Sequence, residues 1–566
     1  MNGAPKRQWR IGEQDRAVTM ALAREVGVAP VVAKLLMARG VHDGDAAREF
    51  LNPTQKQLSD PFLLTDMLAA ADRIAEARER GEHVRVFGDY DVDGIAATAI
   101  LFTGLRRFGI PQVSYGMPQR LVEGYGINAE HVDAASRDGV SLIITVDNGV
   151  RAYAAAARAR DLGIDLIITD HHSIDGPLPE AVAVVNPKRE TPEHPAWRLC
   201  GAGIAFKLSE ALNGTRNDLD LAALGTVADI VPLLGENRVI VTLGLKHMAR
   251  YARTGLAQLA SVAGLKVREL RSRELGFQIA PRLNAAGRLS DGLTALRLLL
   301  EEDTTAAHVM ALELHRANDD RRAIEKAIYD DAVAELDGVF RPEQRTIVLA
   351  RRGWHPGVIG IVATRVQTCF YRPVLLVAID ENGMGKGSGR SIPGFDLVGA
   401  LGACEGTFEQ YGGHQAAAGL TIREENIPAF REAFEAEALR RLGPDEILPV
   451  LEIDGPVSLS ELDGGFMNTL AHLEPFGNSN PAPLFCALDV ELVPRSPRLL
   501  NGGHLRLSVR QGGRVFEAVG FGFAEWMPPE AVPRRLDIAF VPELNTYRNE
   551  TYVQLVLRDL RPAQGG

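Results

Sequence analysis

The chain has 566 residues, of which 46% are hydrophobic and 24% charged, and its formal net charge is −11 at pH 7. This length exceeds what one hydrophobic core supports, so we expect three or four domains, and the acidic balance argues against a protein that coats nucleic acid through bulk positive charge. The sequence has no run of eighteen uncharged apolar residues, no apolar stretch near its start and no CxxC pair among its four cysteines. These features predict a cytoplasmic protein without a membrane anchor, a zinc ribbon or a disulfide framework.

Short β-rich runs alternate with alanine-rich helical stretches in the first half of the chain. A mixed helical segment, residues 1–60, comes first. The runs VRVF, SLIITV and DLIIT then begin at Val84, Ser141 and Asp165. Strands that alternate with helices at this spacing predict a parallel α/β sheet, and we expect this domain to occupy residues 61–300.

The second half of the sequence predicts a long helix and two further domains. Residues 303–336 contain neither proline nor glycine and keep apolar residues at three-to-four spacing. This pattern predicts a connecting helix, about 50 Å long if unbroken, within residues 301–339. The strand, helix, strand pattern returns in residues 340–445 as a smaller α/β domain. Residues 446–566 hold a series of short β runs, which predicts a small barrel of the OB type.

Acidic side chains follow all three strands of the first predicted sheet. Because the carboxyl ends of parallel strands meet at one edge of a sheet, we expect these side chains to share one crevice. A further acidic residue ends an apolar helical run that stops at Pro232. The positions concerned, in chain order, are Asp89, Asp91, Asp93, Asp147, Asp170, His171, His172 and, at the end of the helical run, Asp229.

This set of side chains suits hard or borderline divalent cations. Carboxylates with imidazole and without thiolate favour Mn²⁺ or Mg²⁺ over Zn²⁺. The set is larger than one ion takes when it must also hold substrate. Two ions roughly 3.5–4 Å apart, bridged by one carboxylate, would use it fully, and that geometry serves in-line hydrolysis of phosphate esters. A calcium-binding EF-hand is disfavoured, because Ile100 stands where that loop requires glutamate.

The motifs that carry these residues resemble those of the DHH phosphoesterase superfamily. DYDVDG, VDNG, DHH and GTVADIVPL occur in that order, and GGHQAAAGL resembles the signature of the DHH-associated domain. PQRLVEGYGIN, GAGIAFKL, APRLNAAGRL and LEPFGNSNPAPLF are similar to segments of the RecJ exonuclease branch, and the likeness covers about residues 50–560. The resemblance implies a parallel-sheet DHH domain, a long helix, a smaller DHH-associated α/β domain and a C-terminal OB barrel that binds nucleic acid.

The resemblance also implies an activity and the residues that perform it. The expected enzyme is a Mn²⁺- or Mg²⁺-dependent exonuclease that degrades single-stranded DNA from its 5′ end and releases nucleoside 5′-monophosphates in DNA repair and recombination. The implied metal ligands are Asp89, Asp91, Asp93, Asp147, His171 and Asp229. The implied catalytic group is Asp147 as the bridge between the ions, His171, His172 as the contact to the scissile phosphate or leaving group, and Asp170 as the carboxylate that orients the histidines.

Substrate-binding positions are expected outside the acidic loops. A forked guanidinium and the backbone N–H groups of a glycine turn are suited to hold a terminal phosphate, and other polar segments offer contacts to backbone phosphates. The candidates are Ser388, Arg390, Gly413 and His414 for the terminal phosphate, and Arg120, Asn284 and Arg288 for the backbone. Single-stranded DNA is the expected partner, a helicase and a single-strand-binding protein are the expected protein partners, and a monomer is the expected state.

Three alternatives stay open from the sequence. A nanoRNase or cyclic-dinucleotide phosphodiesterase would use the same ions on a short substrate, but such enzymes lack a C-terminal barrel. A scaffold of a replication complex would have lost metal ligands. An inorganic pyrophosphatase would need a shorter chain and a histidine in place of Phe87. The sequence does not reveal the physiological ion, activity on RNA, or which aromatic side chains of the barrel stack on bases.

Overall fold

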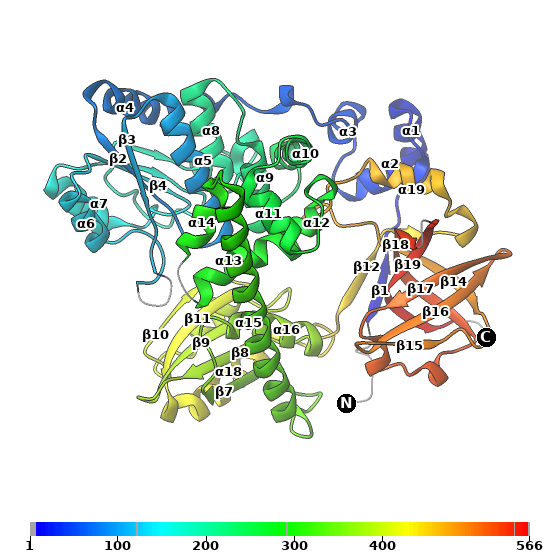
Figure 1. The fold of residues 1–566 in the computed structure, drawn as a ribbon. Coiled ribbons are helices and arrows are strands. Elements are labelled where there is room, and N and C mark those ends of the chain that lie inside the picture. Colours follow the sequence, from blue (N-terminus) through cyan, green and yellow to red (C-terminus); the bar gives the residue numbers. More distant parts are fainter. Residues whose placement is uncertain (1–6, 120–122, 290–291, 548–549, 564–566) are drawn as a thin grey trace. The chain divides into compact units, whose positions relative to one another are not determined.

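The computed structural model of the chain describes residues 7–119, 123–289, 292–547 and 550–563 (Figure 1). The chain folds into two compact units. The first unit comprises residues 42–320 and 473–481, and the second comprises residues 1–41, 321–472 and 482–566. Among the described residues, no helix has both the length and the apolar character that a membrane span requires.

A parallel five-stranded sheet forms the centre of the first unit. Its strand order is β3-β2-β4-β5-β6, and every neighbouring pair is parallel. The strands are β2 His83–Phe87, β3 Gln112–Gly116, β4 Leu142–Val146, β5 Asp165–Thr169 and β6 Ala183–Val185. The three runs expected from the sequence are β2, β4 and β5, which are neighbours in the sheet. The predicted parallel α/β fold is therefore confirmed.

Helices cover both faces of this sheet, as its apolar strands require. On one face, α4, α5 and α8 bury a core with the strand residues Val86, Ile144 and Ile167. On the other face, α6 and α7 pack against Ile143 and Ile168. The helices of this unit are α3 Gly44–Leu51, α4 Met67–Arg80, α5 Val92–Phe108, α6 Ala129–Arg137, α7 Tyr153–Leu162, α8 Gly201–Asn213, α9 Leu219–Ala228, α10 Gly235–Arg250, α11 Thr254–Val262, α12 Ser272–Glu274, α13 Ala280–Leu289 and α14 Leu293–Leu300.

The long connecting helix is present as one element. Helix α15, Thr304–Leu336, is unbroken over 33 residues and continues from the first unit into the second. Its first turns are anchored because Ala307, Ala311 and Leu314 are buried in the core of the first unit.

The second unit contains a mixed five-stranded sheet in the order β10-β11-β9-β8-β7. Only the pair β7–β8 is parallel, and the other three pairs are antiparallel. Its elements are β7 Ile347–Arg352, α16 Ile359–Phe370, β8 Val374–Ile379, β9 Met384–Arg390, α17 Leu397–Gly402, β10 Gln410–Gly413, β11 Ala417–Arg423 and α18 Ile427–Arg441. This is the smaller α/β domain that the sequence predicts.

The C-terminal strands of the second unit form a barrel. The sheet order is β13-β14-β18-β19-β17-β16-β15, and a further pairing of β14 with β16 joins the two sides. The strands are β13 Gly455–Pro456, β14 Phe485–Leu492, β15 Arg498–Leu500, β16 His504–Gln511, β17 Arg514–Gly520, β18 Arg535–Tyr547 and β19 Glu550–Pro562, with α19 Gly464–Ala471 between the first two. The predicted OB-type barrel is confirmed.

The N-terminal residues are divided between the units. Strand β1, Gln8–Ile11, pairs in parallel with β12, Val450–Ile453, and the helices α1, Arg16–Val26, and α2, Pro30–Ala38, belong to the same second unit. Helix α3 belongs to the first unit. The domain boundaries expected from the sequence stay a prediction.

Candidate metal centre

The loop after β2 presents two of its aspartates through the start of α5. Asp91 caps the helix, because its Oδ1 accepts the N–H groups of Asp93 (3.0 Å) and Gly94 (3.1 Å). Gly94 is needed for this turn, since a Cβ there would lie 2.6 Å from the carbonyl oxygen of Asp89. The carboxylate of Asp93 points to the beginning of α8, where it accepts the N–H groups of Gly201 (2.6 Å) and Ala202 (2.9 Å).

Asp147, directly after β4, adopts a backbone conformation that is rare for aspartate. Its φ is +61°, and its N–H donates to Thr169 O at 3.0 Å. Asn148 next to it is fully buried and donates to the carbonyl oxygens of Phe87 and Val146. The side chain of Asp147 passes close to α8, since a Cβ on Gly201 would lie only 2.5 Å from Asp147 Cβ. The loop is thus held by buried polar contacts and a glycine.

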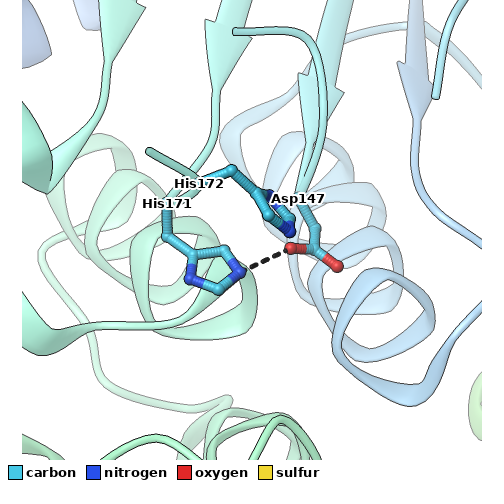
Figure 2. A group of neighbouring side chains, drawn as sticks. All are labelled: Asp147, His171 and His172. Carbon is cyan, nitrogen blue, oxygen red and sulfur yellow. Dashed lines mark ion pairs between the residues drawn. The ribbon is translucent and has the colours of Figure 1, made fainter. Parts of the chain in front are cut away.

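Asp170, after β5, orients the two histidines that follow it. Its Oδ1 accepts the N–H groups of His171 (2.8 Å) and His172 (3.1 Å) and lies 2.7 Å from His172 Nδ1, while Oδ2 accepts the N–H of Val150. Figure 2 shows both imidazoles beside Asp147, with His171 Nε2 3.0 Å from Asp147 Oδ1. Because Asp170 Oδ1 contacts the ring of His172 and the backbone of both histidines, its geometry is that of a carboxylate that positions them.

These loops bring the acidic side chains into two adjoining triads. One triad is Asp89, Asp91 and Asp147, and the other is Asp93, His171 and Asp229, with one ligand atom from each residue within 4.8 Å of the others. The contact between Asp147 and His171 links the triads, and His171 Nε2 also lies 3.7 Å from Asp229 Oδ2.

Among the described residues, several buried atoms of the triads make no hydrogen bond of suitable geometry, although two of them, Asp147 Oδ1 and His171 Nε2, lie 3.0 Å apart. They are Asp147 Oδ1, His171 Nε2 and Asp229 Oδ2. A buried polar atom without a partner is costly and calls for an explanation such as an ion. Carboxylate oxygens with one imidazole are ligands that Mn²⁺ and Mg²⁺ accept, so the residues present fit the expected cofactor.

The electrostatics of the centre favour cation binding. Burial, reinforced by Asp93 and the other neighbouring carboxylates, holds the pKa of Asp147 well above its usual range. Burial and nearby carboxylates also raise the pKa of Asp229 to about 9, although the ammonium of Lys188 opposes this shift. Burial lowers the pKa of His171 to about 4, so its imidazole is neutral at pH 7 and able to act as a ligand. Divalent cations would relieve the repulsion among these carboxylates.

His172 differs from His171 in exposure and in the direction of its pKa shift. Its side chain is 44% exposed. Desolvation opposes protonation of the imidazole, but the hydrogen bond and the charge of Asp170 outweigh this effect and raise the pKa of His172. The hydroxyl of Tyr125 donates to Asp147 O (2.7 Å) and lies 3.1 Å from His172 Nδ1. His172 therefore presents an accessible imidazole, held by Asp170, at the edge of the centre.

Sequence reasoning did not single out Tyr125 or Lys188. Tyr125 stands inside PQRLVEGYGIN, a segment noted only as a family motif. Lys188 follows β6, donates to Trp197 O at 2.9 Å and lies 3.8 Å from the centre of the Trp197 ring. Asn186 joins this turn to the histidine loop, since it donates to His172 O and accepts from the N–H of Lys188. No local pattern of the sequence signals these contacts.

The three residues expected to contact backbone phosphates differ in their surroundings. Asn284 on α13 uses its Oδ1 to accept the N–H of Val92 at 3.1 Å, so it ties α13 to the start of α5. Arg288, one turn further along α13, is half-buried. Arg120 lies outside the described residues. A phosphate contact by any of these three stays a prediction.

The expected terminal-phosphate residues lie together in the second unit. In the register of the sheet, Arg390 on β9 faces Ala417 on β11, and Gly413 on β10 faces the next residue, Ala418. Arg390 Nη1 is 3.3 Å from Ser388 Oγ, and Gly360 of α16 leaves room beneath both, because a Cβ there would lie 2.9 Å from Ser388 Oγ. The side chain of His414 is exposed.

Comparisons with known proteins agree with this geometry. Family models match in three places: the DHH family N-terminal domain over residues 83–226, the DHHA1 domain over 343–439 and the RecJ OB domain over 453–559. The single-stranded-DNA-specific exonuclease RecJ of Bacillus subtilis is 37% identical over 98% of this chain and 71% of its own length. RecJ of Escherichia coli is 33% identical over 94% of this chain and 96% of its own length.

Solved structures give the same result. The crystal structure of RecJ from Thermus thermophilus in complex with Mn²⁺ matches with a TM-score of 0.85 and 32% identity, over 99% of this chain and 80% of that one. A Mg²⁺ complex of the same protein matches with a TM-score of 0.78 and 31% identity, over 99% and 79% of the two chains.

Acidic loops at the carboxyl end of a parallel sheet, with a DHHA1 domain further along the chain, define a metal-dependent phosphoesterase of the DHH class. Within that class, the family is decided by two findings: the RecJ relatives match over nearly the whole chain at 33–37% identity, and a RecJ OB domain is present. The chain belongs to the RecJ family.

Proposed function

We propose that this chain is an exonuclease that degrades single-stranded DNA from the 5′ end towards the 3′ end and releases nucleoside 5′-monophosphates in DNA repair and recombination. The observation that carries the proposal is the pair of adjoining triads linked through Asp147, on a fold shared along the whole chain with the RecJ exonucleases. The cofactors are two divalent ions, Mn²⁺ or Mg²⁺. When bound, the ions supply an activated water and stabilise the leaving oxygen.

The ligands divide between the two ions according to the triads. Asp89, Asp91 and Asp147 would hold one ion, Asp93, His171 and Asp229 would hold the other, and Asp147 would be the residue that bridges the two groups. The double hydrogen bond from the start of α8 to Asp93 fixes the second group, and the capping bonds of Asp91 fix the first. Both groups are therefore organised before an ion arrives, which limits the reorganisation that binding requires.

His172 contacts the scissile phosphate or the leaving group. Its 44% exposure makes the ring accessible, and its raised pKa favours the protonated form, which can donate. Asp170 holds the ring, and the hydroxyl of Tyr125 borders it. Asp170 thus acts through His172, and its own oxygens do not need to reach the substrate.

The second unit holds a terminal phosphate. Ser388 and Arg390 on β9 offer a hydroxyl and a guanidinium, and Gly413 and His414 offer a turn at the end of β10, with β11 between the two strands. A guanidinium fork matches phosphate geometry better than an ammonium does. Asn284, Arg288 and Arg120 contribute contacts to backbone phosphates. The enzyme acts as a cytoplasmic monomer and receives its strand from a helicase and a single-strand-binding protein.

A labelled-strand time course tests the proposal. The purified chain with Mn²⁺ is given single-stranded DNA labelled at the 5′ or the 3′ end, the matching blunt duplex, and Asp147→Ala as the inactive control. We expect the 5′ label to leave at once as a mononucleotide while the 3′-labelled strand shortens progressively, with no reaction of the duplex or by the variant. Cleavage of short or cyclic dinucleotides but not of long strands would identify a different substrate, and no metal-dependent hydrolysis at all would favour a scaffold.

A further inference from the structure

The segment Leu473–Pro481 belongs to the first unit, although the chain on both sides of it belongs to the second. It is anchored by Arg238 of α10, whose side chain is almost completely buried. The guanidinium donates to Phe50 O (2.8 Å), Leu473 O (3.0 Å) and Glu474 O (2.8 Å). Leaving a buried cation without acceptors strongly destabilises the folded state, so these hydrogen bonds fix the start of the segment.

Further hydrogen bonds fold the rest of the segment into a compact loop. Ser272 Oγ donates to Phe476 O at 2.6 Å, and the fully buried Asn480 donates to Leu473 O and Pro475 O, both at 2.8 Å. Gly477 allows a close approach to the turn before α10, because a Cβ there would lie 2.5 Å from Leu233 Cδ1. The loop is therefore held at both ends and in its middle.

The tip of this loop contacts the residue that follows the metal ligand Asp229. Asn478 Nδ2 donates to Ile230 O at 2.6 Å, and Asn478 O accepts the N–H of Leu233 at 2.8 Å. The two bonds span the turn from the end of α9 to the start of α10. Asn478 thus holds both ends of the segment that begins at the ligand.

Ile230 needs such support because its own conformation is unfavourable. Its φ is +59°, in the left-handed region that β-branched residues avoid. Its side chain is 69% exposed, so burial does not stabilise the turn. Asp229 is the residue at the end of α9, and its backbone N–H donates to Gly225 O at 2.9 Å. If Ile230 relaxed to an extended conformation, the peptide after Asp229 would rotate and the carboxylate would move away from His171.

We propose that Asn478 is a positioning residue for the metal centre: through its hydrogen bonds to Ile230 and Leu233, the loop Leu473–Pro481 keeps Asp229 in place to bind its ion. The inference rests on the proposed function, since it takes Asp229 to be a metal ligand. Asn478 is not among the proposed ligands. Its effect should therefore appear in metal affinity, as for other groups that orient ligands.

The test is Mn²⁺ binding to the full-length chain, measured by titration calorimetry and by the electron paramagnetic resonance signal of free Mn²⁺. Asn478→Ala should weaken binding of one of the two ions about 10–100-fold. Asn478→Asp, which keeps the size of the side chain but loses the donor, should do the same. Asn382→Ala, at an exposed asparagine of the second unit, is the matched control and should bind like the wild type. At saturating Mn²⁺ the KM for DNA should be unchanged.

A second substitution tests whether the positive φ of Ile230 is the reason that Asn478 is needed. Asparagine tolerates positive φ, so Ile230→Asn in the Asn478→Ala chain should restore most of the lost Mn²⁺ affinity. Wild-type Mn²⁺ affinity in both Asn478 variants, or no recovery in the double variant, would overturn the inference. Melting in EDTA verifies that each variant is folded. A wild-type chain that binds no Mn²⁺ would instead refute the metal centre itself, so the two failures are distinguishable.

Discussion

Asp147 is the residue through which the two triads meet. Its carboxylate belongs to the first triad and lies 3.0 Å from the imidazole of the second. Asp147→Asn keeps the size of the side chain but removes the charge and half of the bridging capacity. We expect the rate of Mn²⁺-dependent hydrolysis to fall by more than the roughly 100-fold that is typical of losing an outer-sphere partner. Single-turnover assays at several Mn²⁺ concentrations measure this, and retention of a tenth of the activity would contradict the bridging role.

Asp170 has a different role, so its substitution should have a different effect. Asp170→Asn loses the charge that raises the pKa of His172 and replaces one of the two acceptor oxygens by an NH2 group, which cannot accept the hydrogen bonds made there. We expect a loss of roughly 10–100-fold in kcat with metal affinity nearly unchanged. Steady-state kinetics combined with Mn²⁺ titration separate the two quantities. A fall in metal affinity as large as the fall in kcat would show that Asp170 acts mainly through the metal site, where it also holds the backbone of His171, and not through His172.

The metal-free chain should also respond to pH through Asp229. The pKa of Asp229 is about 9 in the fold, against about 3.9 in an unfolded chain, so the folded state binds the extra proton between these values. Stability must then fall as pH rises through that window. In EDTA, Asp229→Asn should therefore melt at a higher temperature than the wild type at about pH 8, with a difference that shrinks towards about pH 4. Parallel melting curves at both pH values would disprove the shift.

At the scale of elements, the approach of α8 to the loop after β4 determines the geometry of the centre. Gly201, the first residue of α8, donates to Asp93 and leaves no room for a Cβ beside Asp147. Gly201→Ala should displace these ligands and reduce the rate about 100-fold, as small misplacements of reacting groups do. Gly464→Ala, at the start of α19 where a Cβ meets nothing within 4 Å, is the control. Equal activity of the two variants would show that the loop adapts.

The arrangement of elements could largely be predicted from the sequence. Apolar runs of about five residues that alternate with helices determine a parallel sheet, and the position of Asp89, Asp147 and Asp170 after those runs places them at one edge. The contacts that refine the site could not be predicted in this way. Tyr125 lies in a glycine-rich segment without periodicity, and a positive φ at the β-branched Ile230 opposes local preference. Asn478 acts across 248 residues, a separation at which no local pattern carries information.

At the scale of the whole molecule, the RecJ OB domain is the part that we expect to bind the single strand by base stacking. The structure separates its aromatic residues, since Phe516 and Phe523 are buried, whereas Phe521 after β17 is 54% exposed. Phe521→Ala should raise the KM for long single strands by about tenfold, the effect of losing one stacked base, and leave kcat unchanged. Leu488→Ala, at another exposed position of the barrel, is the control. Equal KM values for the two variants would exclude Phe521 as a stacking residue.

Because the first unit is discontinuous in sequence, its folding is completed late during synthesis of the chain. A ribosome makes the chain from the N-terminus, and domains generally fold as they emerge. All the proposed ligands have appeared once residue 229 is made, but the loop that supports Asp229 follows only at Asn478. A nascent chain therefore exposes its carboxylates long before the last of them is fixed. We expect the hydrolase to acquire full affinity for its ions only after Asn478 has been synthesised, about 250 residues after the last of the proposed ligands.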